Sequence, residues 1–138
     1  MKEKIAEFLE DNGFLPITNW HSFEIIHKDI CPEDSQDIDR IRDIVSDNNG
    51  LYVYEKDGTI MYVGKGKPLF DRIKNHYVSS YQEVPGDTKD KRWHRFFLSH
   101  QGKIRIYWKE LEDEETRQVV EKMLGYVLSP IFESFSTK

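Results

Sequence analysis

The chain has 138 residues, of which 38% are hydrophobic and 13% aromatic, enough for one domain with a buried core and too many for a disordered chain. No apolar run approaches the roughly 20 residues that span a bilayer, and the first ten residues lack the features of a secretory signal, so we expect a cytoplasmic protein without a membrane partner. The single cysteine, Cys31, excludes an internal disulfide and a multi-cysteine zinc site. The histidines lack the close spacings of zinc-binding helices, so a metal here would have oxygen ligands, which favours Mg²⁺ or Mn²⁺ over zinc.

The net charge of −5 is distributed unevenly along the chain. Residues 1–47 carry a net charge of −7, residues 48–109 carry +6, and residues 110–138 carry −4. Aromatic residues interleave with Lys and Arg in the basic segment, a mixture suited to phosphate contacts and base stacking: Lys89, Lys91, Arg92, Trp93, Arg95, Phe96, Phe97, Lys103, Arg105, Tyr107, Trp108 and Lys109. A solvated face over an ordinary core explains the same residues.

The first 47 residues predict an acidic, mainly helical extension of the remaining chain, residues 48–138, within a single structural domain. Ile5, Phe8 and Leu9 recur at helical spacing before the Asn12-Gly13 stop. Residues 19–26 fit either a strand or an irregular covering segment. A second helix follows, and its inward side chains are expected to be Ile38, Ile41 and Val45.

Residues 51–55 and 59–64 predict a β-hairpin around Lys56-Asp57-Gly58. A two-residue Asp57-Gly58 loop would place Tyr52 opposite Val63, whereas a three-residue loop would place it opposite Tyr62. We predict the three-residue loop because it separates the two faces better. It places on one face Leu51, Val53, Met61 and Val63, and on the other Tyr52, Tyr54, Ile60 and Tyr62.

Pro68 suits the start of a helix in which Arg72 and His76, four residues apart, project on one side. A short helix over residues 92–100, a strand over 103–111 and a helix ending before Pro130 complete the pattern. This order predicts an α/β (α+β) fold with a small three-stranded, mostly antiparallel sheet flanked by helices.

Five elements in order resemble the GIY-YIG nuclease superfamily. Gly50-Leu51-Tyr52 and Tyr62-Val63-Gly64 stand for the two naming triplets, Arg72 and His76 follow the second, and Glu121 precedes Pro130 by nine residues. One departure is Glu133, where the family often has an asparagine. The resemblance covers Gly50 to about Pro130 and implies a metal-dependent endonuclease on this scaffold.

The resemblance implies a catalytic set of Tyr52, Tyr62, Arg72, His76 and Glu121. Tyr52 would orient or deprotonate the attacking water, and His76 would accept its proton, since a phenol of pKa about 10 is a poor base alone. Arg72 offers a rigid fork of donors to the phosphate, and Tyr62 would position phosphate or water. Glu121 would hold one Mg²⁺ or Mn²⁺ ion.

We expect DNA as the partner, with contacts from Lys65, Lys67, Lys91, Arg92 and Arg95. A nuclease acting on RNA or branched DNA fits the same residues, and so does a non-catalytic nucleic-acid or protein-binding module. Taken singly, each site residue also has an ordinary explanation: Tyr52 and Tyr62 as a cross-strand pair, and Glu121 as the helical partner of Arg117. The sequence leaves the oligomeric state open.

Overall fold

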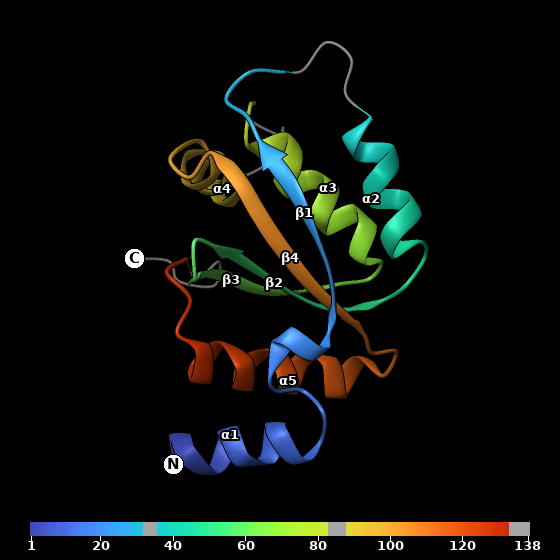
Figure 1. Cartoon of the computed structure of the whole chain (residues 1–138), viewed down its shortest axis with the longest axis vertical. Coiled ribbons are helices and arrows are strands. Elements are labelled where there is room, and N and C mark those ends of the chain that lie inside the picture. The colour runs from blue at the N-terminus through green and yellow to red at the C-terminus, as the bar shows by residue number, and fades with distance from the viewer. Residues whose placement is uncertain (32–35, 83–87, 133–138) are drawn as a thin grey trace.

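A computed structural model describes residues 1–31, 36–82 and 88–132, without the side chains of residues 88–91. Five α-helices and one short 3₁₀ helix surround a four-stranded sheet in this part of the chain (Figure 1). In chain order, the elements are α1 (Lys2–Asp11), η1 (Ile17–Asn19), β1 (His21–His27), α2 (Asp37–Val45), β2 (Gly50–Lys56), β3 (Thr59–Gly66), α3 (Leu69–Ser79), α4 (Thr88–Leu98), β4 (Gly102–Glu110) and α5 (Glu114–Leu128). The predicted α+β class is confirmed. None of the described helices is long and apolar enough to cross a membrane.

The sheet is antiparallel throughout, with the strand order β1-β4-β2-β3. The prediction of three strands was one short, because residues 21–27 form β1 and pair with β4 along their whole length. The segment before residue 47 therefore contributes a strand to the same sheet as the rest of the chain. The boundary at residue 47 stays a prediction.

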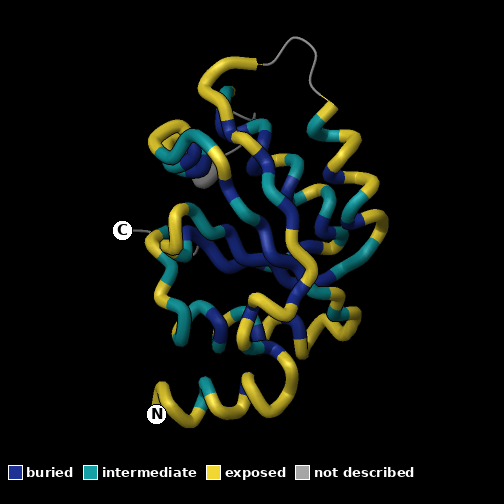
Figure 2. Tube along the Cα trace, in the orientation of Figure 1, coloured by how far each residue is buried: buried dark blue, intermediate teal, exposed yellow. Residues whose placement is uncertain are grey.

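Each face of the sheet carries its own core (Figures 1 and 2). On one face α2, α3 and α4 pack over a mainly aromatic cluster that includes Tyr52, Tyr54 and Trp93. On the other face α1 and α5 cover an aliphatic cluster that includes Leu51 and Val53. Alternate residues of β2 enter different cores because successive strand side chains point to opposite faces.

The predicted register of the β2–β3 hairpin was wrong by two residues. Tyr52 lies opposite Gly64, and Tyr54 lies opposite Tyr62. The loop is the two-residue Asp57-Gly58 turn, with positive φ at both positions as a type I′ turn requires. A β-bulge beyond Tyr54 then adds one residue to β3.

The bulge explains how this register still separates the two faces. The extra residue interrupts the alternation of β3 once, so Met61 lies with the next residue, Tyr62, in the first core and Ile60 packs against the second. The prediction had these two residues exchanged. A bulge depends on how the strands pack and is not visible in the alternation of a single strand.

His27, at the end of β1, is buried among aromatic rings of the first core. It is 1% exposed and contacts the rings of Tyr54, Tyr77 and Phe97, and neither ring nitrogen has a hydrogen-bond partner among the described residues. Burial lowers the pKa of His27 to about 3, although the nearby Asp37 carboxylate acts in the opposite direction. The folded protein therefore holds this imidazole neutral.

This burial predicts a loss of stability in mild acid. Below pH 6.5 the unfolded chain binds a proton at His27 that the folded chain takes up only near pH 3. The free energy of unfolding should thus fall, as the pH decreases through that window, by up to about 1.4 kcal/mol per pH unit from this residue. Urea unfolding at pH 7 and pH 4.5 measures the effect, and His27→Leu should reduce the difference.

His21→Gln is the matched control because His21 is exposed at the other end of the same strand. It should leave the pH dependence of unfolding unchanged. Equal pH dependence in wild type and His27→Leu would contradict the prediction.

Candidate active site

Tyr52 and His76 form a buried hydrogen bond between β2 and α3. The Tyr52 hydroxyl lies 2.6 Å from Nε2 of His76, and the two residues are 0% and 2% exposed. The start of α3 is tied to the sheet because the Leu69 N–H donates to the Asn48 carbonyl just before β2. With Tyr52 as donor, Nε2 of His76 is the acceptor, and the Nδ1–H tautomer follows.

Arg72 adds a positive charge to the same group of residues. It is half-buried one turn before His76 on α3, close enough to the phenols of Tyr52 and Tyr62 to interact with them electrostatically. Burial lowers the pKa of Arg72, but the two phenols outweigh this effect and raise it. Burial also raises the pKa of Tyr52 well above its usual value, as does Tyr62, while Arg72 acts against the rise.

Gly64, which closes the second triplet, leaves space for both phenol rings. A Cβ atom at this position would lie 2.5 Å from Cζ and the hydroxyl of Tyr52 and 2.6 Å from the ring of Tyr62. Real Cβ contacts are not this short, so any other residue would displace the rings. Gly64 is thus required by the positions of Tyr52 and Tyr62.

Glu121 lies on the other face of β3. Its Oε1 is 4.0 Å from Nζ of Lys65, and its side chain is 18% exposed. Lys65 follows Gly64, so alternation turns it toward α5 and away from the tyrosines. Four of the five predicted catalytic residues therefore converge on one face of the sheet. Glu121 lies on the opposite face, beside Lys65 of the edge strand β3.

The sequence allowed Arg117 to be an exposed partner of Glu121 on the same helix. The structure instead buries Arg117. It is 2% exposed, and its guanidinium donates to the carbonyls of Leu111 and Glu112 at 2.8 and 3.1 Å. These hydrogen bonds connect the first turn of α5 to the two residues that follow β4, and so they orient the helix that carries Glu121.

The family resemblance implies one carboxylate, that of Glu121, as the protein ligand of a metal at this site. The described residues contain no group of three or more His, Cys, Asp and Glu that could hold a metal ion. Mg²⁺ usually keeps several waters and takes one or two carboxylates together with substrate phosphate oxygens. Glu121 alone therefore fits a hydrated divalent cation and not a closed zinc or calcium cage.

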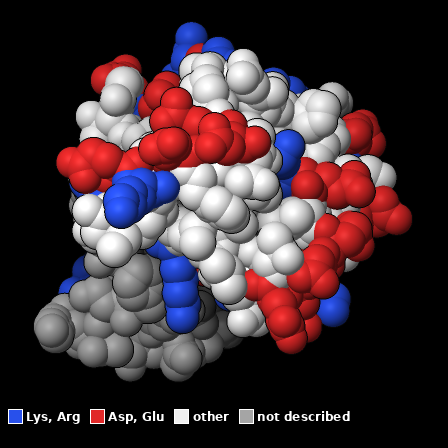
Figure 3. Space-filling model, turned by 90° about the horizontal axis from the view of Figure 1, so that it is seen from below, with Lys and Arg blue, Asp and Glu red and all other residues white. Residues whose placement is uncertain are grey.

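The predicted nucleic-acid contacts are spread over two elements. Lys65 and Lys67 lie at the end of β3 and just after it, whereas Arg95 is exposed on α4 and Arg92 is half-buried there. The side chain of Lys91 and the whole of Glu133 lie outside the described residues. The acidic residues gather elsewhere, on the face formed by α1 and α5 (Figure 3).

The expected stacking role of most aromatic residues in the basic segment is wrong. Four of them belong to the two cores with exposures of at most 7%, namely Trp93, Phe97, Tyr107 and Trp108. Phe96 is half-buried against the first core. Their alternation with basic residues reflects amphipathic α4 and β4 and not a base-stacking surface.

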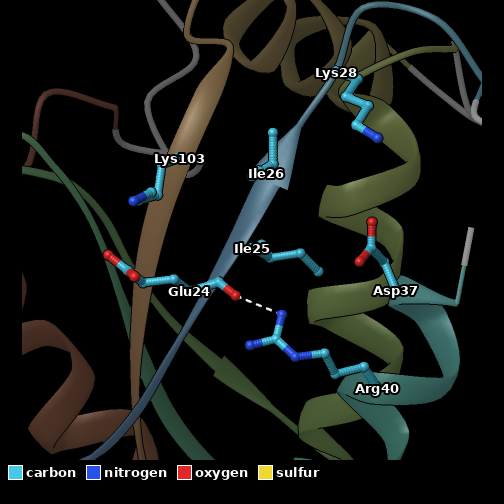
Figure 4. A pocket seen from close by; sticks show the side chains of 7 residues that line it. All are labelled: Glu24, Ile25, Ile26, Lys28, Asp37, Arg40 and Lys103. Carbon is cyan, nitrogen blue, oxygen red and sulfur yellow. Dashed lines mark hydrogen bonds between the residues drawn. The ribbon is translucent and has the colours of Figure 1, made fainter.

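A separate hollow of about 340 Å³ lies between β1 and α2 (Figure 4). Arg40 donates to the Glu24 carbonyl at 2.6 Å, and the Asp37 carboxylate accepts from the Tyr77 hydroxyl at 2.7 Å. None of the residues implied as catalytic lines the hollow. Its charged groups instead hold α2 against the sheet.

Known structures with a similar fold were found, although no protein-family model and no curated sequence match the chain. A point mutant of bacteriophage T4 EndoII is 14% identical, with a TM-score of 0.51 over 94% of this chain and 98% of that one. The magnesium-bound GIY-YIG endonuclease domain of Thermotoga maritima UvrC is 17% identical, with a TM-score of 0.47 over 70% of this chain and 96% of that one. A point mutant of that domain, bound to its catalytic divalent cation, is 16% identical, with a TM-score of 0.48 over 76% of this chain and 100% of that one. The chain therefore has the fold of bacteriophage T4 EndoII.

Proposed function

We propose that the protein is a metal-dependent endonuclease that hydrolyses phosphodiester bonds in DNA. The observation that carries this proposal is the buried hydrogen bond between Tyr52 and His76, with the positive charge of Arg72 close to the same phenol. A proton acceptor, a hydroxyl and a fixed cation thus meet at one point, which is what attack of water on a phosphodiester requires.

Tyr52 acts as a proton relay between water and His76. As the water oxygen bonds to phosphorus, its proton passes to the Tyr52 oxygen while the Tyr52 proton passes to Nε2 of His76. A relay is needed because burial raises the phenol pKa, so a lasting phenolate would be costly. The bond from phosphorus to the leaving ester oxygen breaks, and that oxygen takes a proton from solvent.

Arg72 binds the phosphate beside Tyr52. Its guanidinium is close to the phenols of Tyr52 and Tyr62, and Tyr52 is fully buried. A phosphodiester offers this fork of donors stronger, charged acceptors than the phenols do. Tyr62 positions the phosphate or the attacking water.

Glu121 would hold the divalent cation, and its carboxylate lies 4.0 Å from the ammonium group of Lys65. The cation supplies Lewis acidity toward the phosphate and the leaving oxygen. Lys67, Arg92, Arg95 and Lys91 contact the flanking phosphates. The carboxylates that gather on the surface of α1 and of the first turn of α5 disfavour DNA contacts there (Figure 3).

The decisive experiment compares nicking of plasmid DNA in Mg²⁺ and Mn²⁺ by wild type, Arg72→Ala and Glu121→Ala. We expect both variants to cleave at least about a hundredfold more slowly, since each loses charge stabilisation in the transition state. Arg105→Ala and Glu115→Ala are the controls, as Arg105 pairs with Glu24 on the far strands and Glu115 is exposed on α5.

Equal nicking by wild type and both site variants would overturn the catalytic proposal. DNA binding without cleavage by wild type would favour the non-catalytic binding module. Branched DNA and RNA in parallel reactions identify the preferred substrate.

A second prediction separates the Tyr52 hydroxyl from the ring that carries it. Tyr52→Phe should lower the cleavage rate by about a hundredfold or more, because the proton relay is broken while the ring still fills its place. Tyr54→Phe is the matched control: Tyr54 is equally buried two residues along β2, and its hydroxyl has no hydrogen-bond partner among the described residues. Single-turnover cleavage should stay within about twofold of wild type for Tyr54→Phe, and similar losses in both variants would rule out the relay.

A further inference from the structure

Trp93 of α4 packs directly on the imidazole of His76. The ring centroids are 4.0 Å apart with an interplanar angle of 36°, the shortest of the ring contacts that His76 makes in the described part of the chain. The indole also meets the ring of Tyr62 edge-on at 4.5 Å and 86°. One buried side chain thus touches both the proton acceptor and a phosphate-positioning tyrosine of the proposed site.

The rings around His76 limit how its imidazole can turn. Trp93 and Phe97 lie at shallow angles to its plane, 36° and 37°, whereas Tyr54 and Tyr62 approach nearly at right angles, 89° and 76°. Rotation of the imidazole about χ2 would drive its edge into these rings. The packing therefore keeps Nε2 directed at the Tyr52 hydroxyl.

Trp93 is itself held from two sides. It stacks on Phe97 one turn further along α4, with an interplanar angle of 11°. The chain that follows α5 pairs with β3, as the Phe132 N–H donates to the Met61 carbonyl at 2.9 Å, and places the Phe132 ring 4.5 Å from Trp93. The indole is thus a rigid support and not a mobile cover.

The geometry points to Trp93 as a positioning residue that fixes the imidazole of His76 for proton transfer from Tyr52, an inference that rests on the proposed function. It also stabilises the proton once transferred, since an imidazolium against an indole face is a cation–π contact in a water-free setting. In this way α4, which carries none of the catalytic residues that the family resemblance implies, takes part in the chemistry.

The test replaces the indole by an apolar chain or by another aromatic ring. Trp93→Met should lower kcat at least about tenfold while leaving KM for plasmid DNA within about twofold, because it disturbs proton transfer and not phosphate binding. Trp93→Phe keeps an aromatic face and should recover kcat to within about threefold of wild type. Trp20→Met is the control, since Trp20 is a buried tryptophan of the other core; its kcat should not change.

Nitrogen NMR of the His76 ring gives a readout independent of cleavage. In wild type the ring should be the Nδ1–H tautomer with Nε2 as acceptor, and its carbon-bound protons should be shifted upfield by the indole. Trp93→Met should give a mixture of tautomers, whereas Trp20→Met should give the wild-type spectrum.

The outcomes separate the two proposals. Equal kcat in Trp93→Met and Trp20→Met, or a His76 tautomer unchanged in Trp93→Met, would overturn the positioning role. Lack of cleavage by wild type would overturn the proposed function, while the NMR measurements would still decide whether Trp93 orients His76. If Trp93→Met does not fold, the wild-type ring shifts and the Trp93→Phe spectrum decide, and unshifted His76 protons would overturn the inference.

Discussion

The register of the β2–β3 hairpin is the constraint on which the arrangement of the site depends. The Asp57-Gly58 turn and the bulge beyond Tyr54 place Tyr52 opposite Gly64. Since Gly64 has no Cβ, the end of the Tyr52 ring fits beside it and reaches Nε2 of His76. A slip of one residue would turn every side chain of β3 to the other face and separate Tyr62 from Arg72.

The edge strand β3 separates the residues proposed for proton transfer and phosphate binding, on one face, from the proposed metal ligand Glu121, on the other. Proton transfer and phosphate binding belong to the α3 face, where aromatic rings exclude water from Tyr52 and His76. Glu121 and Lys65 belong to the α5 face, where we propose that the cation binds. The surface charge adds to this division, because Asp and Glu side chains gather on the face that carries α1 and α5 (Figure 3).

Local patterns predicted much of this structure. The spacing of apolar residues located α3 and α5, and the four-residue interval between Arg72 and His76 correctly put both on one side of α3. The bulge was missed because it arises where two strands meet, and the role of Trp93 was misjudged because basic neighbours in the sequence do not reveal which face of α4 is buried.

The α+β class, the hairpin and the order of the Tyr, Arg, His and Glu residues are predictable from the amino-acid sequence, since they follow from short-range periodicity and from motif spacing. The three-dimensional fold was needed to show that β1 completes the sheet, that Tyr52 is buried, and that Glu121 lies beside Lys65 on the other face of β3. These features depend on contacts between residues far apart in the chain, whose partners and register no local pattern specifies.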